Sequence, residues 1–309
     1  MEKFAIIDLG TNTFNLLVAE KVNNKEFKLI YSEKIPVKLG EGGINKGVIE
    51  PIPFERGINA LRTYKKKIEE LGIEQISAFA TSAIRSAQNG KDFVTKALAE
   101  TGITINVING NREAELIYKG VKLAVEVDDE YALIMDIGGG STEFILCSQQ
   151  GIVWKKSFDL GAARLLEKFK PSEPITKDEI LNLKTHLLNH LQELWQIAKR
   201  HRITCLIGSS GSFDSFTEMV CAKHNQKINL KEIKNFKLEI TDFEELFSQI
   251  IKSNREERLC IPGLVEMRVD MIVISSILTK LILDELYLNK IIVSTYALKE
   301  GVLHELMNQ

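Results

Sequence analysis

The chain carries one pattern twice, as Ile6-Ile7-Asp8-Leu9-Gly10-Thr11-Asn12-Thr13-Phe14 and again as Ile134-Met135-Asp136-Ile137-Gly138-Gly139-Gly140-Ser141-Thr142. Each copy has an apolar strand that ends in Asp-x-Gly, then small or hydroxyl-bearing residues, then a second apolar strand. The two copies are about one domain length apart. The repetition predicts two related α/β halves, each of which opens with a β-hairpin.

The tip of each hairpin has the residue types that hold a phosphate group. Glycines let backbone N–H groups approach an anion closely, and an aspartate at each strand end can hold Mg²⁺ directly or through its waters. Taken alone, either hairpin also fits a tight turn whose aspartate caps its own backbone. Two matched copies, with the run Gly208–Ser212 after a third strand, favour phosphate binding. The candidate side-chain donors are Thr11, Asn12, Thr13, Ser141 and Thr142.

The rest of the chain alternates short apolar runs with segments of helical periodicity. The acidic turn Asp128–Glu130 is the best candidate boundary, which predicts domains over residues 1–125 and 126–296. Asn111 is the expected N-cap of one helix, and Thr176 forms a capping box with Glu179 in another. Strands are expected at 4–7, 14–19, 27–35, 75–80, 103–108, 132–136, 143–147, from 152, and at 205–207 and 291–293; helices are expected at 53–71, 92–100, 111–125, 162–169, 176–200, 243–253, 269–288 and 297–307.

The composition is that of a soluble globular protein. Of 309 residues, 44% are hydrophobic and 27% are charged, and 40 basic against 42 acidic residues give a formal net charge of −2. This balance argues against a nucleic-acid partner, which requires a basic surface. No apolar run approaches the roughly 20 residues that span a bilayer, and Asp8 interrupts the N-terminal apolar stretch, so neither a membrane span nor a signal peptide is expected. The cysteines Cys147, Cys205, Cys221 and Cys260 lack CxxC spacing, which predicts reduced thiols in a cytoplasmic protein.

Several segments together resemble one known family. Two Asp-x-Gly hairpins with a later glycine loop are similar to the actin/Hsp70/sugar-kinase superfamily. Within it, the sequence resembles the short form of the exopolyphosphatase/guanosine-pentaphosphate phosphatase family, up to the segment Thr295–Leu303. The resemblance implies two actin-like (ribonuclease H-like) domains with an interdomain cleft, the first of them joined by the C-terminal helix 297–309. The other segments that carry it are Asp8–Thr13, Ala80–Arg85, Arg112–Tyr118, Asp136–Glu143 and Gly208–Ser212.

This resemblance implies a role for individual residues in the cleft. Glu113 matches the family's general base, and a helix start favours its ionised form. Arg85 matches an arginine that lines the substrate channel, and its planar fork suits a phosphate. Asp8, Asp136 and Glu143 are expected to bind Mg²⁺ and its water shell. The expected phosphate-binding residues are Gly10, Thr11, Asn12, Thr13, Arg85, Gly138, Gly139, Gly140, Ser141, Gly208, Ser209, Ser210 and Gly211.

From the residues alone, simpler interpretations stay open. Glu113 also fits a charge that only stabilises the first helical turn, and Arg85 fits a surface side chain. Glu143 also fits an exposed strand residue. The run Gly208–Gly211 also fits a plain strand-to-helix turn with Ser212 as the N-cap.

Three further features differ from a simple family match. His186 and His190 have the spacing of a zinc pair, but without a third ligand in view they indicate a solvated helix face. Arg268 receives no role, because additional residues around the family's Pro-x-Arg-Ala-Asp run leave its register uncertain. Longer family members continue with a helical domain where this chain ends at Gln309, so processive action on long chains is not expected.

The activity that the resemblance implies is an exopolyphosphatase, a Mg²⁺-dependent hydrolase that releases the terminal phosphate of inorganic polyphosphate. Guanosine pentaphosphate presents the same terminal anhydride, so the residues leave both substrates open. A superfamily kinase is disfavoured because no adenine-pocket signature is seen, and a filament or chaperone ATPase is disfavoured by the missing peptide-binding domain. The resemblance also implies a cytoplasmic homodimer.

Overall fold

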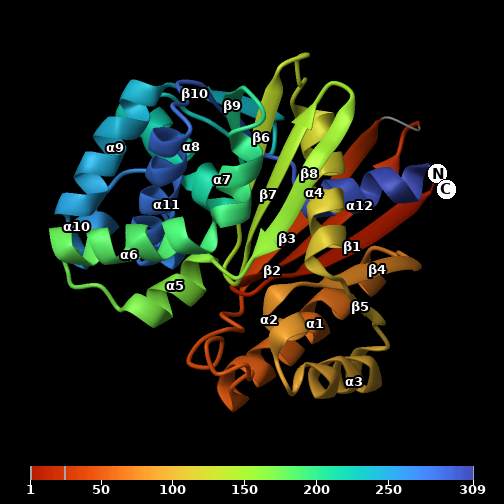
Figure 1. Cartoon of the computed structure of the whole chain (residues 1–309). Coiled ribbons are helices and arrows are strands. Elements are labelled where there is room, and N and C mark those ends of the chain that lie inside the picture. The colour runs from red at the N-terminus through yellow and green to blue at the C-terminus, as the bar shows by residue number, and fades with distance from the viewer. Residues whose placement is uncertain (1, 24–25, 309) are drawn as a thin grey trace.

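The computed structural model describes residues 2–23 and 26–308, and these form two α/β halves that each contain one β-sheet (Figure 1). The strands are β1 (Lys3–Leu9), β2 (Thr13–Lys21), β3 (Phe27–Pro36), β4 (Gln75–Ala80), β5 (Ile105–Val107), β6 (Tyr131–Ile137), β7 (Thr142–Ser148), β8 (Gly151–Phe158), β9 (Ile203–Ser209), β10 (Asn235–Leu238) and β11 (Ile291–Ser294). Within this part of the chain the first sheet has the order β3-β2-β1-β4-β5 and the second has the order β10-β11-β9-β6-β7-β8.

The two sheets repeat one topology. Strand β1 pairs antiparallel with β2 and parallel with β4, and β6 pairs in the same way with β7 and β9. A third antiparallel strand, β3 or β8, continues each hairpin. This confirms the predicted fold class, an α/β protein with two related halves that each open with a hairpin. Strand β10 is absent from the predicted set, because a four-residue edge strand is too short to show a period of two.

Helices cover the outer faces of both sheets, and two of them lie between the sheets (Figure 1). They are α1 (Pro51–Glu70), α2 (Ser82–Ser86), α3 (Gly90–Thr101), α4 (Gly110–Ala124), α5 (Ala162–Phe169), α6 (Lys177–His190), α7 (Gln192–Ala198), α8 (Gly211–Lys223), α9 (Ile240–Lys252), α10 (Arg255–Leu259), the 3₁₀ helix η1 (Glu266–Arg268), α11 (Met271–Glu285) and α12 (Leu298–Met307). None of the described helices is both long and apolar enough to cross a membrane. All four cysteines are free thiols.

The helix predicted over residues 176–200 is divided in the structure. Its predicted capping box at Thr176 is present, but α6 ends at His190 and α7 begins after Leu191. The carbonyl of Leu188 accepts hydrogen bonds at 3.0 Å from the side chains of Gln192 and Trp195. Because these side chains bind a carbonyl that would otherwise serve the helix backbone, the helix is interrupted there.

The N-cap prediction for α4 is wrong by two residues. Asn109 is the cap, and its Oδ1 accepts a hydrogen bond from the backbone N–H of Arg112 at 2.8 Å. The predicted cap, Asn111, lies inside the first turn. Both asparagines are good capping residues, so composition does not separate them.

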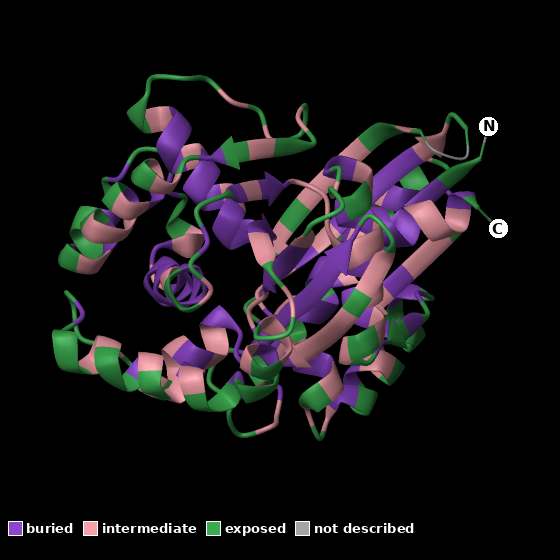
Figure 2. Cartoon of the chain, turned by 45° about the horizontal axis from the view of Figure 1, so that its top comes forward, coloured by how far each residue is buried: buried purple, intermediate pink, exposed green. Residues whose placement is uncertain are grey.

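Alternate residues of the central strands face two different hydrophobic cores, and both faces are buried (Figure 2). In β1, Ile7 packs into the core that contains α1, whereas Ile6 packs into a core shared with the second sheet. Strand β6 divides in the same way, with Ile134 in the shared core. Because side chains alternate along a strand, Asp8 lies on the face of Ile6 and Asp136 on the face of Ile134. Both aspartates therefore face the space between the halves.

Helices α4 and α12 lie in that shared core, and their backbones are in direct contact. A Cβ atom on Gly120 would lie 1.9 Å from the carbonyl oxygen of Ala297, and one on Gly301 would lie 1.8 Å from that of Leu116. Only glycine permits so close an approach. The C-terminal helix thus contacts the half to which the predicted division at 125/126 assigns it, while the division itself stays a prediction.

Candidate active site

A cavity of about 130 Å³ lies where the two hairpins meet. Most of the residues that the sequence predicts for a phosphate site line this cavity. The predicted residues that line it are Asp8, Gly10, Thr11, Asn12, Thr13, Glu113, Asp136, Gly138, Gly139, Gly140, Ser141, Ser210 and Gly211. The predicted residues Arg85, Glu143, Gly208 and Ser209 lie outside this lining.

The two hairpin turns are built alike. The N–H of Gly10 donates to the carbonyl oxygen three residues later at 3.1 Å, and the N–H of Gly138 does the same at 3.0 Å. The turns also lie against each other, since a Cβ atom on Gly140 would lie 2.5 Å from the Oγ1 of Thr11. A side chain at this glycine would therefore have to displace the side chains of Thr11 and Ser82.

Asp8 enters the cavity from the first hairpin. Its Oδ2 accepts a hydrogen bond from the Nδ2 of Asn15, which faces it across the strand pair, at 3.1 Å. Burial raises the pKa of Asp8 to about 6; the positive charge of Lys299 lowers it, and the negative charge of Asp136 raises it further. A carboxylate in this setting is stabilised by any cation that enters the cavity.

Asp136 enters from the second hairpin and binds the third loop. Its carboxylate accepts hydrogen bonds from the hydroxyls of Ser209 and Ser210, at 2.6 Å and 2.7 Å. Ser210 has a φ of 70° with a ψ of 179°, a backbone conformation that favours glycine and costs about 1–3 kcal/mol. Burial raises the pKa of Asp136, and the two hydroxyl donors oppose the shift. The strained serine is thus positioned by the aspartate, and the loop's predicted contact with phosphate stays a prediction.

Glu113 lies in the first turn of α4 and forms a buried ion pair with Arg85. The Nη1 of Arg85 lies 2.7 Å from the Oε2 of Glu113 and donates a second hydrogen bond to the carbonyl of Ile108 at 3.1 Å. Burial raises the pKa of Glu113 to about 7, while the charge of Arg85 lowers it. Glu113 therefore titrates close to neutrality, and Arg85 binds this carboxylate in the absence of a ligand.

Glu143 is buried and pairs in register with Asp136, so the alternative of an exposed strand residue is wrong. Its Oε1 accepts a hydrogen bond from the hydroxyl of Ser157 at 2.6 Å. Burial raises the pKa of Glu143 well above its usual range, and the charges of Glu113 and Asp136 add to the shift. This carboxyl is positioned behind the cavity wall rather than on it.

Three cations that received no role from the sequence line the cavity: Lys34 on β3, Arg268 on η1 and Lys299 at the start of α12. The guanidinium of Arg268 lies against the first residue of α8, where a Cβ atom on Gly211 would lie 1.6 Å from Nη2. No local motif unites three residues so far apart in the chain. Arg268 lies within a run that resembles the family, and the uncertain register alone concealed it.

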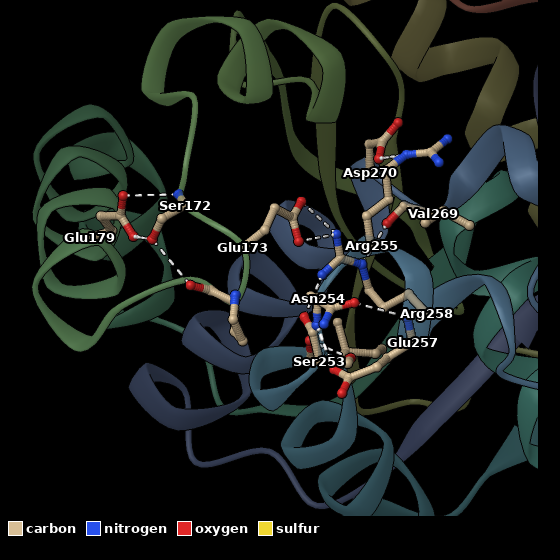
Figure 3. A network of polar contacts seen from close by, with 12 residues as sticks. Ser172, Glu173, Glu179, Ser253, Asn254, Arg255, Glu257, Arg258, Val269 and Asp270 are labelled. Carbon is tan, nitrogen blue, oxygen red and sulfur yellow. Dashed lines mark hydrogen bonds and ion pairs between the residues drawn. The ribbon is translucent and has the colours of Figure 1, made fainter.

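A neighbouring network fixes the backbone that carries Arg268 (Figure 3). Arg258 is buried and donates to the carbonyl of Val269 at 2.9 Å and to that of Ser253 at 2.6 Å. Its guanidinium also forms a two-point contact with the carboxylate of Glu173, at 2.7 Å to each oxygen. Since Val269 follows Arg268 directly, this network holds the cation at the cavity.

The residues present fit Mg²⁺ by their donor chemistry. Asp8 and Asp136 offer hard carboxylate oxygens from facing hairpins, and Mg²⁺ usually takes one or two carboxylates together with waters and phosphate oxygens. Within residues 2–23 and 26–308, no group of three or more His, Cys, Asp or Glu side chains could hold a metal ion. A cation would therefore take its other ligands from water and substrate. His186 and His190 lie ring to ring, 3.9 Å between centroids, and belong to no such group.

Comparisons with known proteins point to one family. A family model described as the Ppx/GppA phosphatase family matches residues 17–309. The crystal structure of an exopolyphosphatase from Cytophaga hutchinsonii has a TM-score of 0.96 at 38% identity, over 99% of this chain and 98% of that one. A Ppx/GppA family member from Aquifex aeolicus shares the fold, with a TM-score of 0.81 at 23% identity over 99% of this chain and 98% of that one. A bifunctional 3-dehydroquinate synthase/phosphatase from Fusobacterium nucleatum is 36% identical over 303 residues, which are 94% of this chain but only 44% of that protein's length.

Proposed function

Because the chain belongs to the Ppx/GppA phosphatase family, we propose that it hydrolyses the terminal phosphoanhydride of inorganic polyphosphate with Mg²⁺. The observation that carries the proposal is the position of Glu113, a buried carboxyl with a pKa of about 7 that faces two phosphate-type turns. A general base is most effective when its pKa lies near the working pH. The similarity to a protein named an exopolyphosphatase supports the choice of substrate.

In the proposed reaction, backbone N–H groups and hydroxyls of the turns hold the oxygens of the terminal phosphate. Glu113 accepts a proton from the attacking water, whose oxygen bonds to the terminal phosphorus. The bridging P–O bond breaks, and the shortened chain leaves with the bridging oxygen. Arg85 orients the Glu113 carboxylate through the 2.7 Å contact. Asp8 and Asp136 would hold Mg²⁺, which when bound supplies positive charge beside the phosphate oxygens.

Guanosine pentaphosphate is the second candidate substrate, because it presents the same terminal anhydride. One observation favours it. A second cavity of about 380 Å³ adjoins the first, and the aromatic rings of Phe27 and Tyr296 on its wall lie 5.8 Å apart. Aromatic side chains are suited to stack on a nucleobase.

The test is phosphate release with Mg²⁺ from long-chain polyphosphate, tripolyphosphate and guanosine pentaphosphate, measured side by side. Glu113→Gln should lower kcat by about 10²–10⁴-fold because the general base is lost, with substrate binding retained. The matched control is Glu115→Gln, which removes a half-buried carboxylate of the same helix; this carboxylate pairs with Lys155 outside the cavity. This control should keep near-normal turnover.

Two outcomes would contradict the proposal. Near-normal turnover of Glu113→Gln would remove Glu113 from its role as the base. Inertness of the unmodified protein towards all three substrates, with ATP-dependent labelling of an acceptor, would indicate a kinase.

A further inference from the structure

The two cavities share a junction. The second cavity, of about 380 Å³, adjoins the first, and a substrate that extends from the first cavity into the second passes the residues that line both. These residues are Lys34, Gly211, Asp214, Arg268, Thr295 and Lys299.

Positive charge is concentrated at this junction. Lys299 is paired with Glu300 at 3.0 Å, which leaves Lys34 and Arg268 as the other cations. Among residues 2–23 and 26–308, the guanidinium of Arg268 has neither a hydrogen-bond acceptor nor an ion-pair partner, although the residue is half-buried against the start of α8. Burial lowers the pKa of its guanidinium, and the negative charge of Asp214 opposes this shift. A cation in this setting is stabilised by an anion that enters the junction.

Asp214 faces these cations, as does Glu218 one turn further along α8. The Oδ2 of Asp214 lies 3.3 Å from the Nζ of Lys34, so the pair connects the first sheet to helix α8 in the second half. The carboxylate is more buried than the amine, with 18% of the Asp214 side chain exposed against 48% for Lys34. Asp214 thus places a negative charge beside Lys34 at the junction.

A simpler role for Asp214 is stabilisation of the helix. It lies in the first turn of α8, where any carboxylate interacts favourably with the helix dipole. That role accounts neither for its pairing with a lysine of the opposite half nor for its place on the wall of both cavities.

We propose that Asp214 is a specificity-determining residue: it neutralises the junction in the free protein and disfavours substrates long enough to extend into the second cavity. The inference rests on the proposed function and adds a chain-length preference to it. A polyphosphate chain carries negative charge along its length, so each phosphate that passes the junction meets the Asp214 carboxylate. To bind Lys34, the polyphosphate must also separate this lysine from the Asp214 carboxylate.

The experiment measures binding of long-chain polyphosphate and of pyrophosphate by calorimetry without Mg²⁺, so that turnover does not interfere. Asp214→Asn should bind long-chain polyphosphate about tenfold more tightly, because one repulsive charge is lost and Lys34 is released. Pyrophosphate binding should change less than about twofold. In Mg²⁺, the KM for the long chain should fall by the same factor.

The matched control is Asp242→Asn. Asp242 lies in the first turn of α9, which has the same length as α8, 13 residues. It pairs with Lys223, and neither residue lines either cavity. It should leave the affinity for both ligands unchanged. Lys34→Ala should weaken long-chain binding and should reduce the gain produced by Asp214→Asn in the double variant. Asp214→Ser, which keeps an oxygen at the helix start, replaces Asp214→Asn if that variant does not fold.

Unchanged or equally shifted affinities for the two ligands in Asp214→Asn would overturn the inference, and so would an identical gain in the background of Lys34→Ala. Failure of the proposed function has a different signature. The unmodified protein would then release no phosphate from any polyphosphate, whereas the binding comparison would still decide the role of Asp214.

Discussion

The two hairpins place their aspartates at equivalent positions, yet the residues beside them in each sheet differ. In the first sheet, the strand neighbours form a row of one acid, one amide and one amine. In the second sheet, the corresponding row has two acids and a hydroxyl. The first row is Asp8, Asn15 and Lys34, and the second row is Asp136, Glu143 and Ser157.

Because of this difference, the two copies of one topology are suited to bind groups of opposite charge. In the first row, Asn15 donates to Asp8 and is itself in register with Lys34; an amide and an amine suit binding of anionic oxygens. The second row faces an acid with another acid, and Glu143 is close enough to Glu113 for their charges to raise its pKa. It therefore suits binding of cations and protons. A repeated backbone with changed side chains can thus supply the two opposite charges that phosphate hydrolysis requires.

The largest expected effect is on the pH dependence of stability. Asp8 and Glu113 have pKa values raised to about 6 and about 7, so between about pH 4 and those values the folded protein binds more protons than the unfolded chain. The free energy of unfolding should therefore fall as pH rises through this window, by about 3 kcal/mol for Asp8 alone. Urea denaturation of the metal-free protein at about pH 5 and about pH 8 measures the difference.

Single substitutions show how much each row contributes to the pH dependence of the free energy of unfolding. Asp8→Asn should remove the part of the loss that falls below about pH 6. Glu143→Gln should remove a larger part at higher pH, because its pKa is raised well above the usual range. Equal effects of the two substitutions would show that the rows do not differ in acidity. A stability that rises with pH would contradict the burial argument itself.

A second prediction makes the first row resemble the second. Asn15→Asp replaces the amide donor of Asp8 with a facing carboxylate, so the pKa of one of the pair should rise. We expect kcat/KM at neutral pH to fall by about 2–10-fold, because a rise of one to two units from a pKa of about 6 leaves only about half to a tenth of Asp8 ionised, with recovery as pH is raised. The control is Asn15→Ser, which keeps a hydroxyl donor. A variant with full activity would mean that the amide is not needed.

The last prediction concerns the hydroxyl of the second row. Ser157→Ala leaves the buried Glu143 without its 2.6 Å donor and should cost about 1–3 kcal/mol of unfolding free energy. Ser172 donates to Glu179 at the same 2.6 Å distance but on the surface (Figure 3), so Ser172→Ala should cost less than about 1 kcal/mol. Thermal and urea unfolding compare the two. Equal costs would contradict the claim that burial strengthens the second row.

Local patterns predicted most of the fold. Strand β4 lies at the predicted residues, and the hairpins follow directly from the repeated Asp-x-Gly pattern. The errors lie where side chains of other residues intervene. The helix break at Leu191 depends on Trp195 and Gln192 binding one carbonyl, and helical periodicity does not report such a contact.

The candidate site was predictable where its residues are close together in the chain. The turns around Gly10 and Gly138 line the cavity, and each turn is formed by consecutive residues of one motif. Lys34, Arg268 and Lys299 come from three separate segments, and only the tertiary fold brings them to one wall. The pairing of Arg85 with Glu113 is likewise a long-range contact. The sequence indicated both residues without indicating that they bind each other.

The contact between α4 and α12 has a consequence for synthesis of the chain. Residues 298–307 leave the ribosome long after the first sheet and α4, yet they complete the core that both halves share. The Nζ of Lys21 also donates to the carbonyl of Met307 at 2.7 Å. Until α12 emerges, apolar faces of β1 and β6 stay open to solvent and to chaperones. The first half is therefore made early, but its core is completed only after the second half has been synthesised.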